Sequence, residues 1–204
     1  MDDLDKALGE LSHIRRQMAR TTEFRGYGPA TLVTTGAIAV IAAAVQAHWI
    51  PEPAANVRGY LAVWFATAVV CGGIIAVQMH TRARRMHSAM ADEMIWMAVE
   101  QFLPALVAGL LATVVLTCFV PNAVWMLPAL WQLIYSLGVF SSCRFLPRPV
   151  MLGGAWYLLT AVVCLAFGDA RALSPWTMGL AYGAGQVLIA AALYAGAEGV
   201  SDEE

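Results

Sequence analysis

Two glutamines with aromatic neighbours are the residues best suited to chemistry in the apolar part of this sequence. Gln132 and Gln186 each lie near the middle of a long apolar run. Trp125 lies seven residues before Gln132 and Tyr135 three residues after it, which places them on one face of an α-helix. Tyr182 precedes Gln186 by four residues and therefore stacks beside it. The pattern fits an aromatic-lined polar pocket for a small ligand, and it equally fits hydrogen bonds that join two helices.

A carboxylate next to an amide marks the start of another apolar run. Glu100 and Gln101 are followed by Pro104, whose missing N–H leaves the carbonyl of Glu100 without its helical partner. An ionisable residue inside a membrane span is a candidate for a proton- or cation-linked role. Glu100 also falls near the end of its run, where a carboxylate can pair with basic residues of the preceding loop, here Arg82, Arg84 or Arg85. Both roles fit the sequence.

Known catalytic and metal-binding patterns do not occur in the sequence. It contains no P-loop, dinucleotide fingerprint, HExxH motif, EF-hand loop or nucleophile elbow. Four cysteines lie in or at the ends of apolar runs without a CxxC motif, so we interpret them as small buried hydrophobic residues: Cys71, Cys118, Cys143 and Cys164. We therefore predict no catalytic residue and no metal site, and the sequence leaves any cofactor unknown.

The runs that carry these residues are long enough to cross a bilayer as helices. The 204 residues are 60% hydrophobic and 13% charged, against about 25% charged residues in ordinary globular domains. About 20 apolar residues in a helix cross a hydrocarbon core of ~30 Å. We predict an all-α polytopic membrane protein, a six-transmembrane-helix bundle over residues 29–198, with spans at about 30–50, 58–79, 97–119, 122–142, 150–168 and 175–197.

Basic residues are concentrated in alternate connections. Only Arg58 and Arg171 lie on one predicted side. The other ten lie in the N-terminal region, the second loop and the fourth loop: Lys6, Arg15, Arg16, Arg20, Arg25, Arg82, Arg84, Arg85, Arg144 and Arg148. Because basic loops stay in the cytoplasm, we predict that both termini are cytoplasmic. Residues 1–27 have no apolar signal region, so we expect the first span to act as the insertion signal.

Residues 1–28 are predicted to form a cytoplasmic amphipathic helix. Apolar side chains recur there every three or four residues, and acidic residues precede basic ones, as the helix dipole favours. The helix fits a surface segment whose arginines contact lipid headgroups, and it also fits a short coiled coil that contacts a partner through the same region: Arg15, Arg16 and Arg20. An acidic cytoplasmic tail, residues 199–204, closes the chain.

Four stretches of the sequence resemble a family of small six-helix bacterial membrane proteins. They are residues 14–20 (IRRQMAR), 127–149 (LPALWQLIYSLGVFSSCRFLPRP), 155–168 (AWYLLTAVVCLAFG) and 172–186 (ALSPWTMGLAYGAGQ). The family is typical of Acidobacteria and similar phyla, and its members are encoded near winged-helix transcriptional regulators. The resemblance implies a bacterial inner (cytoplasmic) membrane location and a regulatory role. It carries no activity and no site residues over to this chain.

Three functions fit these features. The first is a non-enzymatic sensor or regulatory partner that binds a small ligand in the bundle. The second is a small oligomeric transporter or channel that uses Glu100, Gln132 and Gln186. The third is a cofactor-binding redox subunit. Expected partners are the lipid bilayer and either further copies of the chain or a membrane or cytoplasmic protein. Nucleic acid is not an expected partner, because the regions outside the spans are too small for a binding domain.

Overall fold

The described part of the chain is entirely helical. A computed structural model describes residues 28–86, 89–142 and 150–201, and side chains within 28–81, 99–141 and 150–194. No strand occurs in these ranges, so the predicted all-α class is confirmed. The predicted amphipathic helix with Arg15, Arg16 and Arg20 lies outside the described residues, as do 143–149 and the last three residues of the acidic tail.

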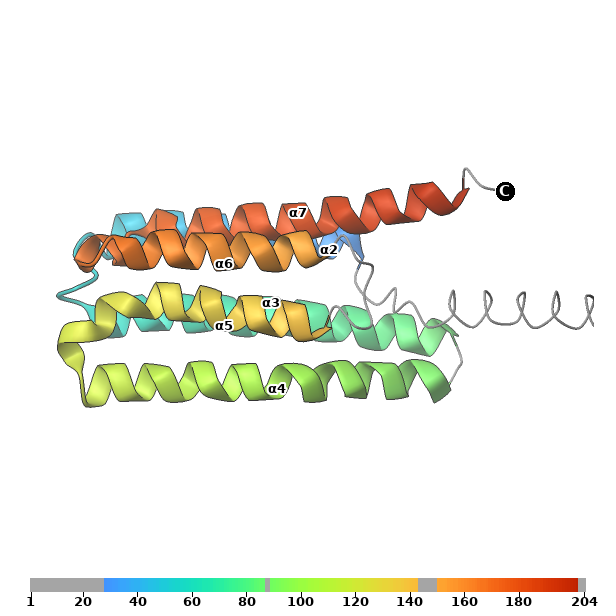
Figure 1. Cartoon of the computed structure of the whole chain (residues 1–204), viewed down its shortest axis with the longest axis horizontal. Coiled ribbons are helices and arrows are strands. Elements are labelled where there is room, and N and C mark those ends of the chain that lie inside the picture. Colours follow the sequence, from blue (N-terminus) through green and yellow to red (C-terminus); the bar gives the residue numbers. More distant parts are fainter. Residues whose placement is uncertain (1–27, 87–88, 143–149, 202–204) are drawn as a thin grey trace, which may run out of the picture.

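The described residues form six long helices that lie side by side and alternate in direction (Figure 1). They are α2 (Pro29–Trp49), α3 (Val57–Met86), α4 (Ala89–Cys118), α5 (Leu127–Ser142), α6 (Met151–Ala166) and α7 (Pro175–Ser201), with the short 3-10 helices η1 (Pro121–Met126) and η3 (Ala170–Leu173). The start of α2 and the end of α7 lie at the same end of the bundle, here called the terminal end (Figure 1). The connections 50–56, 119–126 and 167–174 lie at the other end, here called the connecting end (Figure 1).

Five of the helical segments have the length and composition of membrane spans. They are Pro29–Trp49, Val57–Thr81, Val99–Cys118, Pro121–Ser141 and Pro175–Tyr194. The remaining apolar helix, α6, has 16 residues, which corresponds to about 24 Å of helix against a hydrocarbon core of ~30 Å. The length and apolar composition of these helices therefore support a multi-pass membrane protein. That α6 is a sixth span, and that both termini are cytoplasmic, stay predictions.

Small residues bring α2 and α7 into close contact. A Cβ built on Gly36 would lie 3.0 Å from the carbonyl oxygen of Gly183, and one built on Gly179 would overlap the Cβ of Ala43. Thr35 and Ala39 are also buried on this face of α2. Without a hydrophobic effect between helices in lipid, such close backbone contact is a main source of association. This antiparallel pair is the most extensive helix contact in the described bundle.

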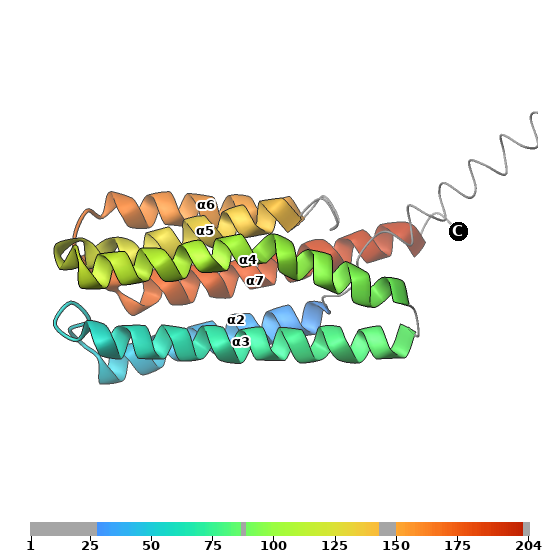
Figure 2. The same cartoon turned by 90° about the horizontal axis from the view of Figure 1, so that it is seen from below.

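The helix α4 lies at one edge of the bundle in Figure 1, and α3 lies at one edge in Figure 2. Only 11% of the apolar stretch of α3 and 6% of that of α4 is buried, against 39–50% for the other three spans. Gly72 and Gly73 of α3 and Gly109 of α4 face open space, since an added Cβ would meet no atom within 4 Å. In a bilayer, lipid tails or a neighbouring helix would cover these surfaces.

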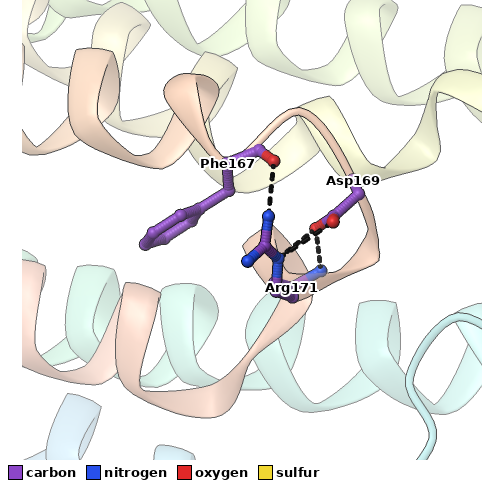
Figure 3. A network of polar contacts seen from close by, with 3 residues as sticks. All are labelled: Phe167, Asp169 and Arg171. Atoms are coloured by element: carbon purple, nitrogen blue, oxygen red, sulfur yellow. Dashed lines mark hydrogen bonds and ion pairs between the residues drawn. The ribbon is translucent and has the colours of Figure 1, made fainter.

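An ion pair closes the turn between α6 and α7 at the connecting end (Figure 3). Gly168, with φ of 68°, ends α6 in the left-handed conformation that favours glycine. Asp169 then accepts hydrogen bonds from the Arg171 Nε, at 2.9 and 3.0 Å, and from the Arg171 backbone N–H at 2.9 Å. The Arg171 Nη2 also donates to the carbonyl of Phe167 at 3.3 Å. These bonds hold the first turn of η3.

The pKa of Asp169 is expected to lie below its usual value. Hydrogen bonds from the Arg171 side chain, and next from its backbone N–H, lower the pKa of Asp169 from the usual value of 3.8. The ion pair therefore stabilises the turn above pH 3.8, and the stabilisation is lost as the pH falls through the lowered pKa. Carboxyl NMR titration should find a higher pKa of Asp169 in Arg171→Gln, which keeps only the backbone N–H donor, than in the control Arg58→Gln. Equal pKa values in both variants would contradict the assignment.

Candidate functional site

A hydrogen bond joins the aromatic and amide residues of α5 and α7. The Gln186 Nε2 donates to the hydroxyl oxygen of Tyr135 across 3.1 Å. Gln186 is buried. The two residues are 51 positions apart in the sequence, so this contact is made by the packing of the two helices. It is the kind of interhelical hydrogen bond that polar side chains make inside membrane bundles.

Three tyrosines pack around this hydrogen bond. The ring of Tyr135 lies 4.8 Å from that of Tyr157 and 5.4 Å from that of Tyr182, both in edge-to-face geometry. The rings of Tyr157 and Tyr182 are 5.2 Å apart, and Phe102 of α4 contacts Tyr135 at 5.7 Å. Four helices, α4 to α7, therefore meet at one aromatic cluster. Edge-to-face pairs such as these stabilise a core beyond the area they bury.

Gln132 lies in the same seam but bonds a different part of α7. Its side chain is fully buried, and its Nε2 donates to the carbonyl of Thr177 at 3.0 Å and lies 3.9 Å from the sulfur of Met178. Because a carbonyl oxygen can only accept, the Thr177 contact fixes which amide atom is the nitrogen. Within the described part of the chain, the Gln132 Oε1 and the Gln186 Oε1 are buried without a hydrogen-bond donor.

Trp125 lies before the α-helix that contains Gln132. It belongs to η1, and α5 begins only at Leu127, so the α-helical spacing between residues 125 and 132 does not apply. Its partly buried ring packs near the connecting end against a cluster that contains Cys164 and Ala172. The structure thus brings Tyr135, Tyr182 and Gln186 together. Trp125 contacts neither Gln132 nor Gln186 in any hydrogen bond described, and it packs against a second cluster that Tyr182 also contacts.

The Glu100 carboxylate is exposed rather than directed into the aromatic core. Glu100 lies on the uncovered face of α4, which continues as a helix through Pro104. Gln101 is partly buried, and its Oε1 has no donor among the described residues. The side chains of Arg82, Arg84 and Arg85, the predicted partners of Glu100, lie outside the described side chains. The predicted ion pair is therefore untested.

A second polar cluster, which the sequence analysis missed, lies closer to the connecting end. Gln46 of α2 is fully buried, and its Nε2 donates to the carbonyl of Leu173 at 2.9 Å. Its Oε1 accepts from the Trp64 Nε1 of α3 at 2.7 Å. One amide thus joins α2, α3 and η3 with both of its polar atoms bonded. The signal that could have found this residue is an amide side chain inside a predicted span.

Two further contacts between α5, α6 and α7 were also missed. The buried Ser136 hydroxyl donates to the carbonyl of Gly154 at 2.8 Å. The Trp156 Nε1 donates to the carbonyl of Ala181 at 2.9 Å. Serine and tryptophan within an apolar run do not by themselves indicate a partner, because the direction of the side chain depends on packing. These bonds hold α6 beside the aromatic cluster.

The helical bundle and its core define a general class of protein but not a particular family. The described chain is an all-helical bundle with five helices long enough to cross a membrane and a polar, tyrosine-rich core. Its described residues contain no group of three His, Cys, Asp or Glu side chains that could hold a metal ion. No family model, no curated protein and no solved structure matches the chain. The family resemblance therefore stays a prediction.

Proposed function

We propose that this chain is a non-enzymatic membrane protein that binds a small ligand in its α5–α6–α7 core and acts as a sensor or regulatory partner. The proposal depends on the buried Gln186 Oε1, which has no hydrogen-bond donor among the described residues and belongs to the amide that bonds Tyr135, one of three packed tyrosines. A buried acceptor without a donor costs about 1–3 kcal/mol. A ligand that donates a hydrogen bond there would recover part of that free energy.

The core sets the chemistry of the proposed ligand. It must donate a hydrogen bond to an amide oxygen, and the rest of it must be apolar or aromatic, because Tyr135, Tyr157 and Tyr182 surround the amide of Gln186. No charged side chain is among the partners described for this cluster, so a neutral ligand fits best. Binding would separate or rotate the rings that now fill the space between α5 and α7.

We place the protein in the bacterial inner membrane with both termini in the cytoplasm. Two features support this orientation. The described chain begins and ends at the same end of the bundle (Figure 1), and ten of the twelve basic residues are assigned to that side. The N-terminal region with Arg15, Arg16 and Arg20 would then report ligand binding to a lipid surface or to a cytoplasmic partner.

Mass spectrometry of the protein purified from native membranes tests ligand binding. We expect a co-purifying small molecule that Gln186→Leu reduces at least about tenfold, because ~1.4 kcal/mol of lost hydrogen bonding is a factor of ten in affinity. The matched control is Gln78→Leu, whose amide accepts from the Gly28 N–H at the terminal end. If the unaltered chain co-purifies with neither a small molecule nor a protein partner, the proposal is wrong.

A small oligomeric transporter or channel is the second candidate. The Gln101 Oε1 also lacks a donor among the described residues, and its neighbour Phe102 contacts Tyr135, so unpartnered polar atoms extend from α4 towards α7. Flux into proteoliposomes that Glu100→Gln or Gln132→Leu abolishes would establish this function. A visible absorption band from the purified protein would instead favour a cofactor-binding redox subunit.

A further inference from the structure

The tryptophan and tyrosine side chains divide into an enclosed set and an exposed set. Among the side chains that the structure describes, the exposed fraction is 73% for Trp49, 47% for Trp176 and 59% for Tyr194. Every other described tryptophan or tyrosine is buried or partly buried. Trp49 is the last residue of α2, Trp176 is the second of α7, and Tyr194 ends the apolar segment Pro175–Tyr194. The exposed set therefore lies at the ends of spans.

The indole N–H groups of the two sets are bonded differently. Trp64, Trp131 and Trp156 each donate to an acceptor inside the bundle, at 2.7–2.9 Å. No acceptor among the described residues bonds the N–H of Trp49 or Trp176. Lipid tails offer no acceptor, so an N–H among them would stay unpaired. These two side chains fit the boundary of a bilayer, where the ring contacts acyl chains and the N–H reaches ester carbonyls or water.

The two exposed tryptophans lie at nearly the same depth at the connecting end. The close contact between Gly179 and Ala43 gives a common reference level for α7 and α2. Trp176 is three residues nearer the connecting end than this contact, and Trp49 is six residues nearer. At a rise of about 1.5 Å per residue, their levels differ by about 4.5 Å along the helices. One thin layer of the bilayer boundary can therefore receive both indoles.

Tyr194 lies at the matching level on the other side of the apolar stretch. It follows Trp176 by 18 residues, which corresponds to about 27 Å of helix and is close to the ~30 Å of a hydrocarbon core. No charged residue lies between the two, and Glu198 follows Tyr194 by four residues. Before Trp176 lies the exposed ion pair of Asp169 and Arg171. The charged residues of this part of the chain thus begin outside the two aromatic levels.

We propose that Trp49 and Trp176 anchor the connecting end in the ester and headgroup layer of one bilayer leaflet, and that Tyr194 occupies the same layer of the other leaflet. The partner of these side chains is the phospholipid interface, not a protein or a further copy of the chain. The turn that contains the ion pair of Asp169 and Arg171 then lies in water beyond this layer. The proposal requires that α2 and α7 cross a bilayer, but it requires neither the ligand nor the orientation of the proposed function.

Fluorescence quenching in vesicles of brominated phosphatidylcholine tests the two tryptophan anchors, because bromine quenches indoles that it contacts. The emission lost in Trp49→Phe or in Trp176→Phe gives the contribution of each residue in the full chain. We expect lipids brominated near the headgroup to quench each contribution at least about twofold more than lipids brominated near the chain ends. The control Trp64→Phe removes an indole that is 5% exposed, and neither lipid should quench its contribution.

Two added tryptophans extend the test to the other leaflet. The emission added by Tyr194→Trp should be quenched most by bromine near the headgroup. The emission added by Val187→Trp, at a 49% exposed position between the two aromatic levels, should be quenched most by bromine near the chain ends.

Two results would overturn the proposal. If bromine near the chain ends quenches Trp49 and Trp176 more strongly, or if neither lipid quenches them, these residues do not lie at the bilayer boundary. If Tyr194→Trp and Val187→Trp show the same preference, Tyr194 does not mark the second boundary.

Discussion

Gly36→Leu is expected to separate α2 from α7 and to destabilise the protein strongly. A Cβ at Gly36 would lie 3.0 Å from the carbonyl oxygen and 3.6 Å from the Cα of Gly183, and backbone atoms cannot rotate away as a side chain can. Overpacking of this kind costs about 3 kcal/mol. We expect the thermal midpoint of the detergent-solubilised protein to fall by about 6–12 °C.

Gly72→Leu is the matched control for this prediction. It places the same side chain in another membrane helix at a glycine where an added Cβ meets nothing within 4 Å. We expect it to leave the midpoint within about 2 °C of the unaltered protein, because leucine favours the helix and contacts only lipid or detergent. Equal losses from Gly36→Leu and Gly72→Leu would show that the α2–α7 contact is not the closest packing in the bundle.

Gln46→Leu is the second prediction with a large expected effect. The change removes both bonds of the buried amide and leaves the Trp64 Nε1 and the Leu173 carbonyl without partners. Each buried polar group left unpaired costs about 1–3 kcal/mol, so the loss should be about 2–6 kcal/mol. Chemical unfolding in mixed detergent micelles, followed by tryptophan fluorescence, measures it.

A second substitution checks the origin of the loss from Gln46→Leu. Adding Trp64→Phe removes the orphaned indole N–H, so the double variant should be no less stable than Gln46→Leu alone, although Trp64→Phe by itself destabilises the protein. The control Gln78→Leu, which removes an amide bonded to the Gly28 N–H at the terminal end, should cost less. Additive losses from Gln46→Leu and Trp64→Phe would contradict the hydrogen bond between them.

The fold class could be predicted from the sequence because its signals are local. Apolar runs without charges set the helices, and Pro29, Pro121 and Pro175 stand at the first positions of helical segments, as the sequence pattern indicates. The end of α6 was less predictable. Its predicted span extended to residue 168, whereas the α-helix ends at Ala166 before the left-handed Gly168. Residues there are apolar enough to continue a span, and only the backbone turn stops it.

The candidate site could be predicted only in part. The spacing between Tyr182 and Gln186 depends on one helix and could be inferred, but the contact with Tyr135 depends on how α5 and α7 pack. Tyr157 was missed for the same reason, since nothing in an apolar run tells which neighbour a tyrosine faces. Trp125 belongs to the 3-10 helix η1, where the α-helical period used for the prediction does not hold, so its placement beside Gln132 stays a prediction.

The short length of α6 has a consequence for the surrounding bilayer. This helix has 16 residues. If α6 is the predicted sixth span, it leaves about 6 Å of an average hydrocarbon core unmatched. Lipids beside α6 would have to thin locally, or headgroups and water would reach deeper on that flank, at a cost of fractions of a kcal/mol per Å. The membrane would then differ in thickness from one flank of the protein to another, and such a protein sorts towards thinner or more deformable regions.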